Sequence, residues 1–238
     1  MKKFLRKVIL RYKSDSDSFL NHYRALGTRI GERTVVYEPT KTVIDTTRPW
    51  MITIGDDVKL TRGVTILTHG YDWSVLAGMN DVVLGSAGEV VIGNNVFVGM
   101  NTMILKGVHI GNNVVIGANS LVNKNIPDNC VAAGNPARVI MSIEDYYEKR
   151  LKEQKKEAFA LYRAYVENMK KEPPVEAFDE FFWLFWKRDD ELLPCFKRQM
   201  SHHARFDETY ANFKNSQPEF NGYEAFLEAA RETLSTQS

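Results

Sequence analysis

The sequence predicts a mainly β chain that is organised around a parallel β-helix with triangular coils. The first observation is a column of aliphatic residues that recur every six positions, namely Ile92, Val98, Ile104, Ile110, Ile116 and Val122. The second is a small or β-branched residue two positions before each of them, namely Val90, Val96, Thr102, Val108, Val114 and Ser120. A period of six matches neither an amphipathic helix nor a half-buried strand. It suits a coil in which three short strands alternate with tight corners.

Equivalent corners of this coil carry the same residues. Asn94-Asn95 and Asn112-Asn113 lie eighteen residues apart, which is one turn of three hexads. Asn and Gly tolerate the positive φ angles that such corners require. The alternative, a sandwich of short strands, would have turns of variable length, so the constant period favours the β-helix.

Residues 1–27 are expected to form an N-terminal basic and helical segment. Within it, residues 1–13 alternate basic and apolar side chains. This stretch could contact an anionic membrane surface weakly. Because it is short, we favour a helix that docks on its own protein or on a neighbouring subunit. The polar residues 14–18 offer helix N-caps, and a short helix should follow and end at Gly27.

The coil itself is expected over residues 28–141, with a loop that protrudes at about 68–89. Its register starts at Ile30 and returns at Ile54 and Ile66. From Ile66 to Ile92 there are 26 residues, which is four hexads plus two, so part of this stretch must leave the coil. A loop that interrupts a rigid repeat is a common place for a functional site.

Residues 142–238 are expected to form an α-helical extension. A capping box at Ser142 to Asp145 should begin a helix that runs to about Lys171. A second helix is expected over 175–188, where aromatic residues occupy nearly every side. We interpret it as a buried packing helix rather than a sugar-stacking surface. A last helix is expected from about Tyr223 to Leu234.

Composition excludes several classes of function. The formal net charge is +1, which gives no global field for binding nucleic acid. The two cysteines are too few for a disulfide framework and fit a reducing compartment. Arg6, Lys7 and Arg11 interrupt the apolar stretch that a signal peptide needs, and no run is long enough to span a membrane. We therefore expect a cytoplasmic protein, with residues 1–13 as its one candidate for contact with the inner membrane surface.

The hexads, the Leu-Thr-His sequence at 67–69 and the sequence AGNPAR at 133–138 together resemble the hexapeptide-repeat acyltransferases. Within that family the chain is most similar to sugar and polysaccharide O-acetyltransferases related to galactoside and maltose acetyltransferases. The resemblance implies a left-handed β-helix and a homotrimer. It also implies acetyl-CoA as co-substrate, which would meet the acceptor between the coils of two subunits.

His69 is the candidate general base. Acetyl transfer to a hydroxyl needs a group that accepts the hydroxyl proton, and the ordinary pKa of histidine suits this task. His69 also matches the catalytic histidine of the family. Asp72 is expected to orient the imidazole, although a backbone carbonyl could do so instead. Tyr71 and Trp73, in the same loop, are the candidates for binding the acceptor.

The coenzyme residues are carried over from the resemblance. The pantetheine arm would contact the backbone at Met100 and Ala118, which follow Gly99 and Gly117. Asn123 and Lys124 replace a Thr-Lys pair that is frequent in the family, and the arginine of AGNPAR, Arg138, would meet a CoA phosphate. No metal is expected, because His69 and His109 are the only histidines in the coil.

The sequence therefore predicts an acetyl-CoA-dependent O-acetyltransferase. Its acceptor would be a sugar hydroxyl of a cell-surface polysaccharide, of capsule or O-antigen type, or of its precursor. An N-acetyltransferase that acts on an amino-sugar nucleotide and a non-catalytic β-helix scaffold are the alternatives. Apolar residues at outward positions of the hexads support a homotrimer, because neighbouring subunits would cover them: Val91, Phe97, Met103 and Val115.

Overall fold

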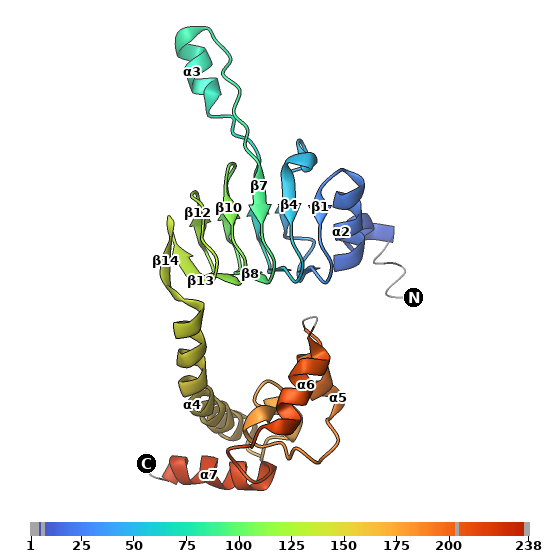
Figure 1. The fold of residues 1–238 in the computed structure, drawn as a ribbon, viewed down its shortest axis with the longest axis vertical. Helices are drawn as coiled ribbons and strands as arrows, with labels where there is room; N and C mark the ends of the chain where they lie inside the picture. The colour runs from blue at the N-terminus through green and yellow to red at the C-terminus, as the bar shows by residue number, and fades with distance from the viewer. Residues whose placement is uncertain (1–4, 6–7, 203–204, 236–238) are drawn as a thin grey trace. The chain divides into compact units, whose positions relative to one another are not determined.

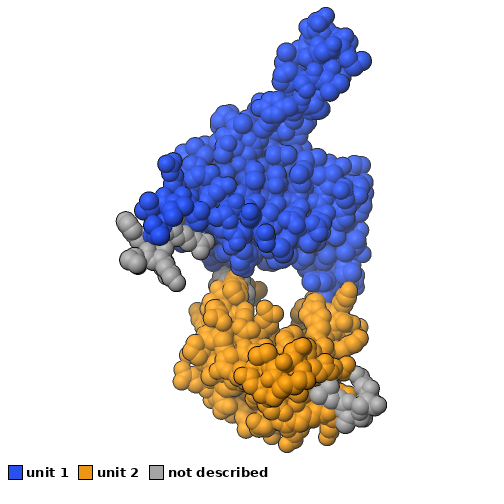
Figure 2. Space-filling view, turned by 180° about the vertical axis from the view of Figure 1, so that it is seen from behind, with its two compact units in different colours: residues 1–146 blue, residues 147–238 orange. Residues whose placement is uncertain are grey.

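The computed structural model describes residues 5, 8–202 and 205–235. The chain divides into two compact units, which Figure 2 shows in different colours: a coil unit (residues 1–146) and a helical unit (residues 147–238). Helix α4 (Ile143–Met169) begins in the first unit and ends in the second. No helix among the described residues is long and apolar enough to span a membrane.

The coil unit is a parallel β-helix of three sheets (Figure 1). The first sheet contains β1 (Arg29–Ile30), β4 (Ile52–Ile54), β7 (Val90–Ile92) and β10 (His109–Ile110). The second contains β2 (Val35–Val36), β5 (Lys59–Leu60), β8 (Val96–Val98), β11 (Val114–Ile116), β13 (Cys130–Gly134) and β14 (Ala137–Ser142). The third contains β3 (Val43–Ile44), β6 (Thr65–Ile66), β9 (Met103–Ile104) and β12 (Leu121–Val122). Only β14 pairs antiparallel among the strands of these sheets.

The column of hexad aliphatics is the core of this unit, as the sequence predicted. Each of the six side chains from Ile92 to Val122 is at most 2% exposed. Successive coils stack in register, so Ile54 pairs with Ile92 and Ile92 with Ile110. Thr102 and Ser120 are buried as well, and both hydroxyls donate hydrogen bonds to the carbonyl of Gly117, at 3.0 and 2.7 Å.

The corners follow the predicted chemistry. Asn95, Asn113 and Asn129 all adopt positive φ, between 54° and 56°. Their side chains form a ladder from coil to coil. The Asn95 amide donates to the Asn113 oxygen at 2.9 Å, and Asn113 donates to Asn129 at 2.8 Å. The repeated Asn therefore both permits the turn and links neighbouring coils.

The N-terminal residues close one end of the coil. A 3-10 helix, η1 (Arg11–Lys13), precedes α2 (Ser16–Ala25), whose N-cap Asp15 accepts a hydrogen bond from the Ser18 N–H at 2.8 Å. Phe19, Leu20 and Tyr23 of α2 are buried in the core of the coil unit. The predicted contact surface over residues 1–13 lies partly outside the described residues, which begin with Leu5 and resume at Val8.

A long arm leaves the coil between β6 and β7, over residues 68–89 (Figure 1). Its two sides pair in antiparallel fashion at His69 and Ala87, and the Gly88 N–H donates to the Thr68 carbonyl at 2.9 Å. Helix α3 (Trp73–Asn80) forms its outer part. The arm therefore returns to the coil at the point where it departed, without breaking the register of the core.

The helical unit differs from the expectation in one element. Its elements after α4 are η3 (Val175–Phe178), η4 (Phe182–Leu184), α5 (Pro194–Met200), α6 (Phe206–Asn215) and α7 (Tyr223–Ser235). The predicted continuous helix over 175–188 is wrong, because η3 and η4 are two short 3-10 helices. With the segment wound in this way, Phe178, Phe182, Leu184 and Phe185 all enter one core. A straight α-helix would instead place Leu184 on the side opposite Phe182. The predicted packing role of these aromatics is confirmed.

The predicted fold class, a mainly β chain, describes only part of the structure. The parallel sheets fit the predicted β-helix, and the Ser142 hydroxyl accepts a hydrogen bond from the Asp145 N–H at 3.0 Å, as the capping box predicted. Helices nevertheless occupy more of the described chain than strands do. The description "mainly β" holds for the coil unit and not for the whole chain.

Candidate active site

His69 lies where the arm leaves β6, and it is held from one side by the preceding coil. Its Nδ1 atom is 2.5 Å from Oδ2 of Asp45 and 3.1 Å from the hydroxyl of Thr47. The Asp45 side chain is 2% exposed and that of His69 is 12% exposed. The imidazole is therefore fixed on its Nδ1 side by two side chains that follow β3.

Asp45 is a buried carboxylate with every acceptor position in use. Five donors surround it: the N–H and hydroxyl of Thr68, the N–H and hydroxyl of Thr47, and Nδ1 of His69. Burial raises the pKa of Asp45, but the hydrogen bonds from Thr68 and Thr47 together lower it by more, so this pKa lies below its ordinary value. Asp45 is therefore ionised across the physiological pH range.

This arrangement selects one tautomer of His69. An ionised carboxylate only accepts hydrogen bonds, so the contact with Asp45 requires a proton on Nδ1. The lone pair then lies on Nε2. A neutral imidazole with Nε2 free can accept a proton from a bound hydroxyl, and the adjacent carboxylate stabilises the imidazolium that forms.

Asp72 does not take the orienting position that the sequence suggested. It is the exposed N-cap residue of α3, and Asp45 occupies the place beside Nδ1 instead. Sequence reasoning missed Asp45 because it lies 24 residues before His69, in the preceding coil. The structure pairs Ile44 with Ile66, so residues just after Ile44 lie beside residues just after Ile66. The hexad period held no signal for this pairing, because Ile44 and Ile66 lie 22 residues apart, which is not a multiple of six.

Of the two aromatic residues predicted to bind the acceptor, Tyr71 lies next to the imidazole and Trp73 lies farther along the arm. The rings of His69 and Tyr71 meet edge to face, with centroids 4.8 Å apart, and Tyr71 and Trp73 follow at 6.3 Å. Tyr71 is 64% exposed. The arm therefore continues from the imidazole through the exposed Tyr71 to the half-buried Trp73.

The residues predicted for the coenzyme lie on other coils. Met100 and Ala118 share the corner between the second and third sheets, where the Asn119 N–H donates to the Met100 carbonyl at 2.7 Å. The glycines before them permit this close stacking, because a side chain on Gly99 would lie 2.5 Å from the backbone nitrogen of Ala118. The close stacking of the coils at this corner therefore depends on Gly99.

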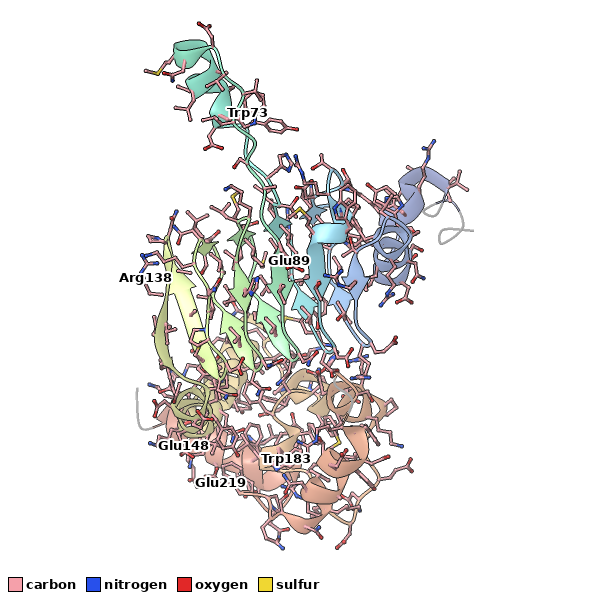
Figure 3. All side chains as sticks on the ribbon, turned by 45° about the horizontal axis from the view of Figure 1, so that its top comes forward. Trp73, Glu89, Arg138, Glu148, Trp183 and Glu219 are labelled. Atoms are coloured by element: carbon pink, nitrogen blue, oxygen red, sulfur yellow. The ribbon has the colours of Figure 1, made fainter. Side chains whose placement is uncertain are left out.

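The remaining coenzyme candidates lie on or after the last strands of the coil unit. Asn123 and Lys124 follow β12 and are exposed. Arg138 is exposed on β14, where its guanidinium donates to the Ala137 carbonyl at 2.7 Å. Figure 3 shows Arg138 at the end of the stack of coils and Trp73 out on the arm. Within one chain the structure therefore brings His69 together with Tyr71, but does not bring it to Arg138.

Among the described residues, no group of three or more His, Cys, Asp or Glu side chains is placed to hold a metal ion. The hydrogen-bond donors around Asp45 are the hydroxyls and backbone N–H groups of Thr47 and Thr68. The pair of Asp45 and His69 can carry out proton transfer at Nε2 of His69.

A stacked coil of hexads with a histidine at the base of a protruding arm defines a hexapeptide-repeat transferase. The model of the family described as "Bacterial transferase hexapeptide (six repeats)" matches residues 89–124. The chain is 40% identical over 152 residues to Protein CapG of Staphylococcus aureus, a match that covers 63% of this chain and 84% of that protein. The chain belongs to this family of acyltransferases.

Two of the similar proteins are named as O-acetyltransferases. The chain is 41% identical over 115 residues to a galactoside O-acetyltransferase of Escherichia coli K12, which covers 47% of this chain and 54% of the relative. It is 40% identical over 111 residues to a polysialic acid O-acetyltransferase of Escherichia coli O1:K1, with 47% and 35% covered. The chain thus spans about half or less of the length of these two enzymes.

The buried carboxylate generates a test of stability. Asp45→Asn should lower the free energy of unfolding of the coil unit by about 1.5–3 kcal/mol near neutral pH. The reason is that the donors around Asp45 bond to two carboxylate oxygens, whereas an amide offers them only one. The folded-state pKa is depressed, so this contribution is fully present above about pH 4 and is lost as the pH falls towards the folded-state value. Urea unfolding of both proteins at a series of pH values measures it.

The difference between wild type and Asp45→Asn should therefore shrink below about pH 4. Asp72→Asn is the matched control, since Asp72 is exposed and this change should have little effect at any pH. A difference for Asp45→Asn that grows as the solution becomes more acidic would contradict the assignment of a depressed pKa.

Proposed function

We propose that this protein transfers the acetyl group of acetyl-CoA to a sugar hydroxyl, in a cell-surface polysaccharide of capsule or O-antigen type or in its precursor. The names of the two O-acetyltransferase relatives support a carbohydrate acceptor. The observation that carries the proposal is the contact of 2.5 Å between Asp45 and His69, which leaves Nε2 as the proton acceptor.

The proposed reaction is a direct transfer. The acceptor hydroxyl gives its proton to Nε2 of His69 as its oxygen attacks the thioester carbonyl. The new C–O bond forms, the C–S bond breaks, and the departing thiolate takes the proton from the imidazolium. Asp45 remains ionised throughout and stabilises the imidazolium in the intervening state. Asp72, at the N-cap of α3, is left with a secondary role at most.

The other predicted residues fit two binding tasks. Tyr71 and Trp73 would stack against the acceptor sugar beside the imidazole. The backbone at Met100 and Ala118 would contact the pantetheine arm. The cationic groups of Lys124 and Arg138 would meet CoA phosphates, with Asn123 beside them.

We further propose that the enzyme is a homotrimer that acts in the cytoplasm. The two free cysteines are consistent with a reducing compartment. Phe97 and Met103 are 42% and 39% exposed on the outer faces of the coil, and Val91 and Val115 are half-buried there. A neighbouring coil would cover these side chains, and it could bring a second subunit's coenzyme residues to His69.

Sedimentation equilibrium at micromolar concentration tests the assembly. We expect three times the chain mass of 27.3 kDa. A monomer at this concentration would contradict the trimer and would also remove the second subunit from the proposed site.

The base is tested by substitution of His69. His69→Ala should lower kcat by about 10²–10⁴-fold, because the acceptor hydroxyl would lose its general base. The affinity for acetyl-CoA should stay close to that of wild type, since the proposed coenzyme residues lie on other coils. Thiol release from acetyl-CoA in the presence of a panel of oligosaccharides measures kcat, and equilibrium binding of CoA measures the affinity.

His109→Ala is the matched control, because His109 is exposed on β10 and is not among the proposed site residues. Activity of His69→Ala within about threefold of wild type would contradict the mechanism. Acetylation of amino-sugar nucleotides in preference to oligosaccharides would support the N-acetyltransferase instead. No thiol release with any acceptor would support the scaffold.

A further inference from the structure

The helical unit contains a basic groove that the proposed reaction does not use. The groove encloses about 380 Å³. The described residues that line it are chiefly Lys152, Lys155, Lys156, Phe159 and Arg163 of α4, with Thr233 of α7 opposite them. The groove belongs to the helical unit alone.

One face of α4 forms one wall of the groove, and Thr233 of α7 adds to the lining. The lining residues of α4 are separated by three or four positions, so their side chains lie on the same side of the helix. From Lys152 to Arg163 the wall is ~16 Å long at the rise of an α-helix. The groove is therefore an extended track that can accommodate a short run of linked rings.

The track has one sign of charge. Four of its described lining residues are cationic, and none carries a carboxylate. Lys155 donates a hydrogen bond to Glu219 at the border, which balances part of its charge. No ion pair joins Lys152 or Lys156 to any described carboxylate. Because the net charge of the chain is only +1, this is a local concentration of positive charge.

The floor of the groove is an aromatic ring in a fixed position. Phe159 is half-buried, and its ring packs against those of Phe220 and Phe226, at centroid distances of 5.9 and 5.7 Å. Phe159 also lines the groove, together with the lysines. An occupant should therefore combine anionic groups with a flat, weakly apolar face.

We propose that this groove binds an acidic saccharide chain, with its carboxylates near the lysines and a sugar ring on Phe159. This inference rests on the proposed function, because it assigns the acceptor to acidic polysaccharides that are held by the helical unit. An anionic membrane is a poorer fit. Aromatic side chains that anchor a protein in a bilayer protrude from it, whereas Phe159 lies in a concave floor.

Binding of a labelled oligogalacturonate to the full-length protein tests the groove. The variant Lys152→Gln/Lys155→Gln/Lys156→Gln removes three charges and keeps good helix formers on exposed positions. Fluorescence anisotropy should show binding by wild type that weakens with added salt, and about tenfold weaker binding by the variant. A neutral dextran of equal length should bind much less. Circular dichroism verifies that the variant is folded.

Lys149→Gln/Lys170→Gln/Lys171→Gln is the control, since it removes the same charge from exposed positions outside the groove. Equal losses in the two variants would overturn the proposal, because they would indicate unspecific attraction. So would binding to anionic phosphatidylglycerol vesicles without binding to oligogalacturonate.

The same assay separates this proposal from the enzymatic one. His69→Ala should bind oligogalacturonate like wild type. If wild type acetylates neutral oligosaccharides but does not bind oligogalacturonate, the groove proposal fails and the proposed function stands. If it binds oligogalacturonate and acetylates no saccharide, the proposed function fails.

Discussion

The stacking of successive coils in one register is the constraint on which the site depends. Ile44 pairs with Ile66 because both side chains enter the same buried column. The next residues of each coil therefore meet, and Asp45 is brought to His69 across 24 positions of sequence. A slip of one residue in either coil would move the carboxylate away from the imidazole and expose an aliphatic side chain.

The coil and the arm have different roles at the site: the coil holds the imidazole in place, and the arm presents aromatic side chains next to it. The coil is rigid, since close glycine and asparagine corners leave little space between its turns. The arm carries the exposed Tyr71 and the half-buried Trp73 away from that rigid body, and paired backbone closes its base. His69 lies at the boundary, so its ring is held by the coil on one side and is next to the arm on the other. This is a suitable place for a group that must keep its orientation while an acceptor binds.

The sequence predicted those features that repeat locally. The hexads identified the buried column from Ile92 to Val122, and the interrupted register located the arm and His69. They did not identify Ile44, which is also buried in this core. The partner of His69 was not predictable in this way, because Asp45 follows a different strand and belongs to no motif near the histidine. The helix expected over 175–188 failed for a related reason. Its aromatic pattern shows that the residues are buried, but the direction in which each is buried depends on α5, α6 and α7. The groove on α4 likewise depends on α7, which is distant in sequence.

The central claim is that Asp45 fixes His69 with the proton on Nδ1 and the lone pair on Nε2. Two-dimensional NMR of the imidazole nitrogens, at a pH where His69 is neutral, measures this directly, with the signals assigned by their absence in His69→Ala. The account predicts a protonated Nδ1 and an unprotonated Nε2. A neutral His69 with its proton on Nε2 would contradict the account, because that nitrogen could not then accept the proton of an acceptor hydroxyl.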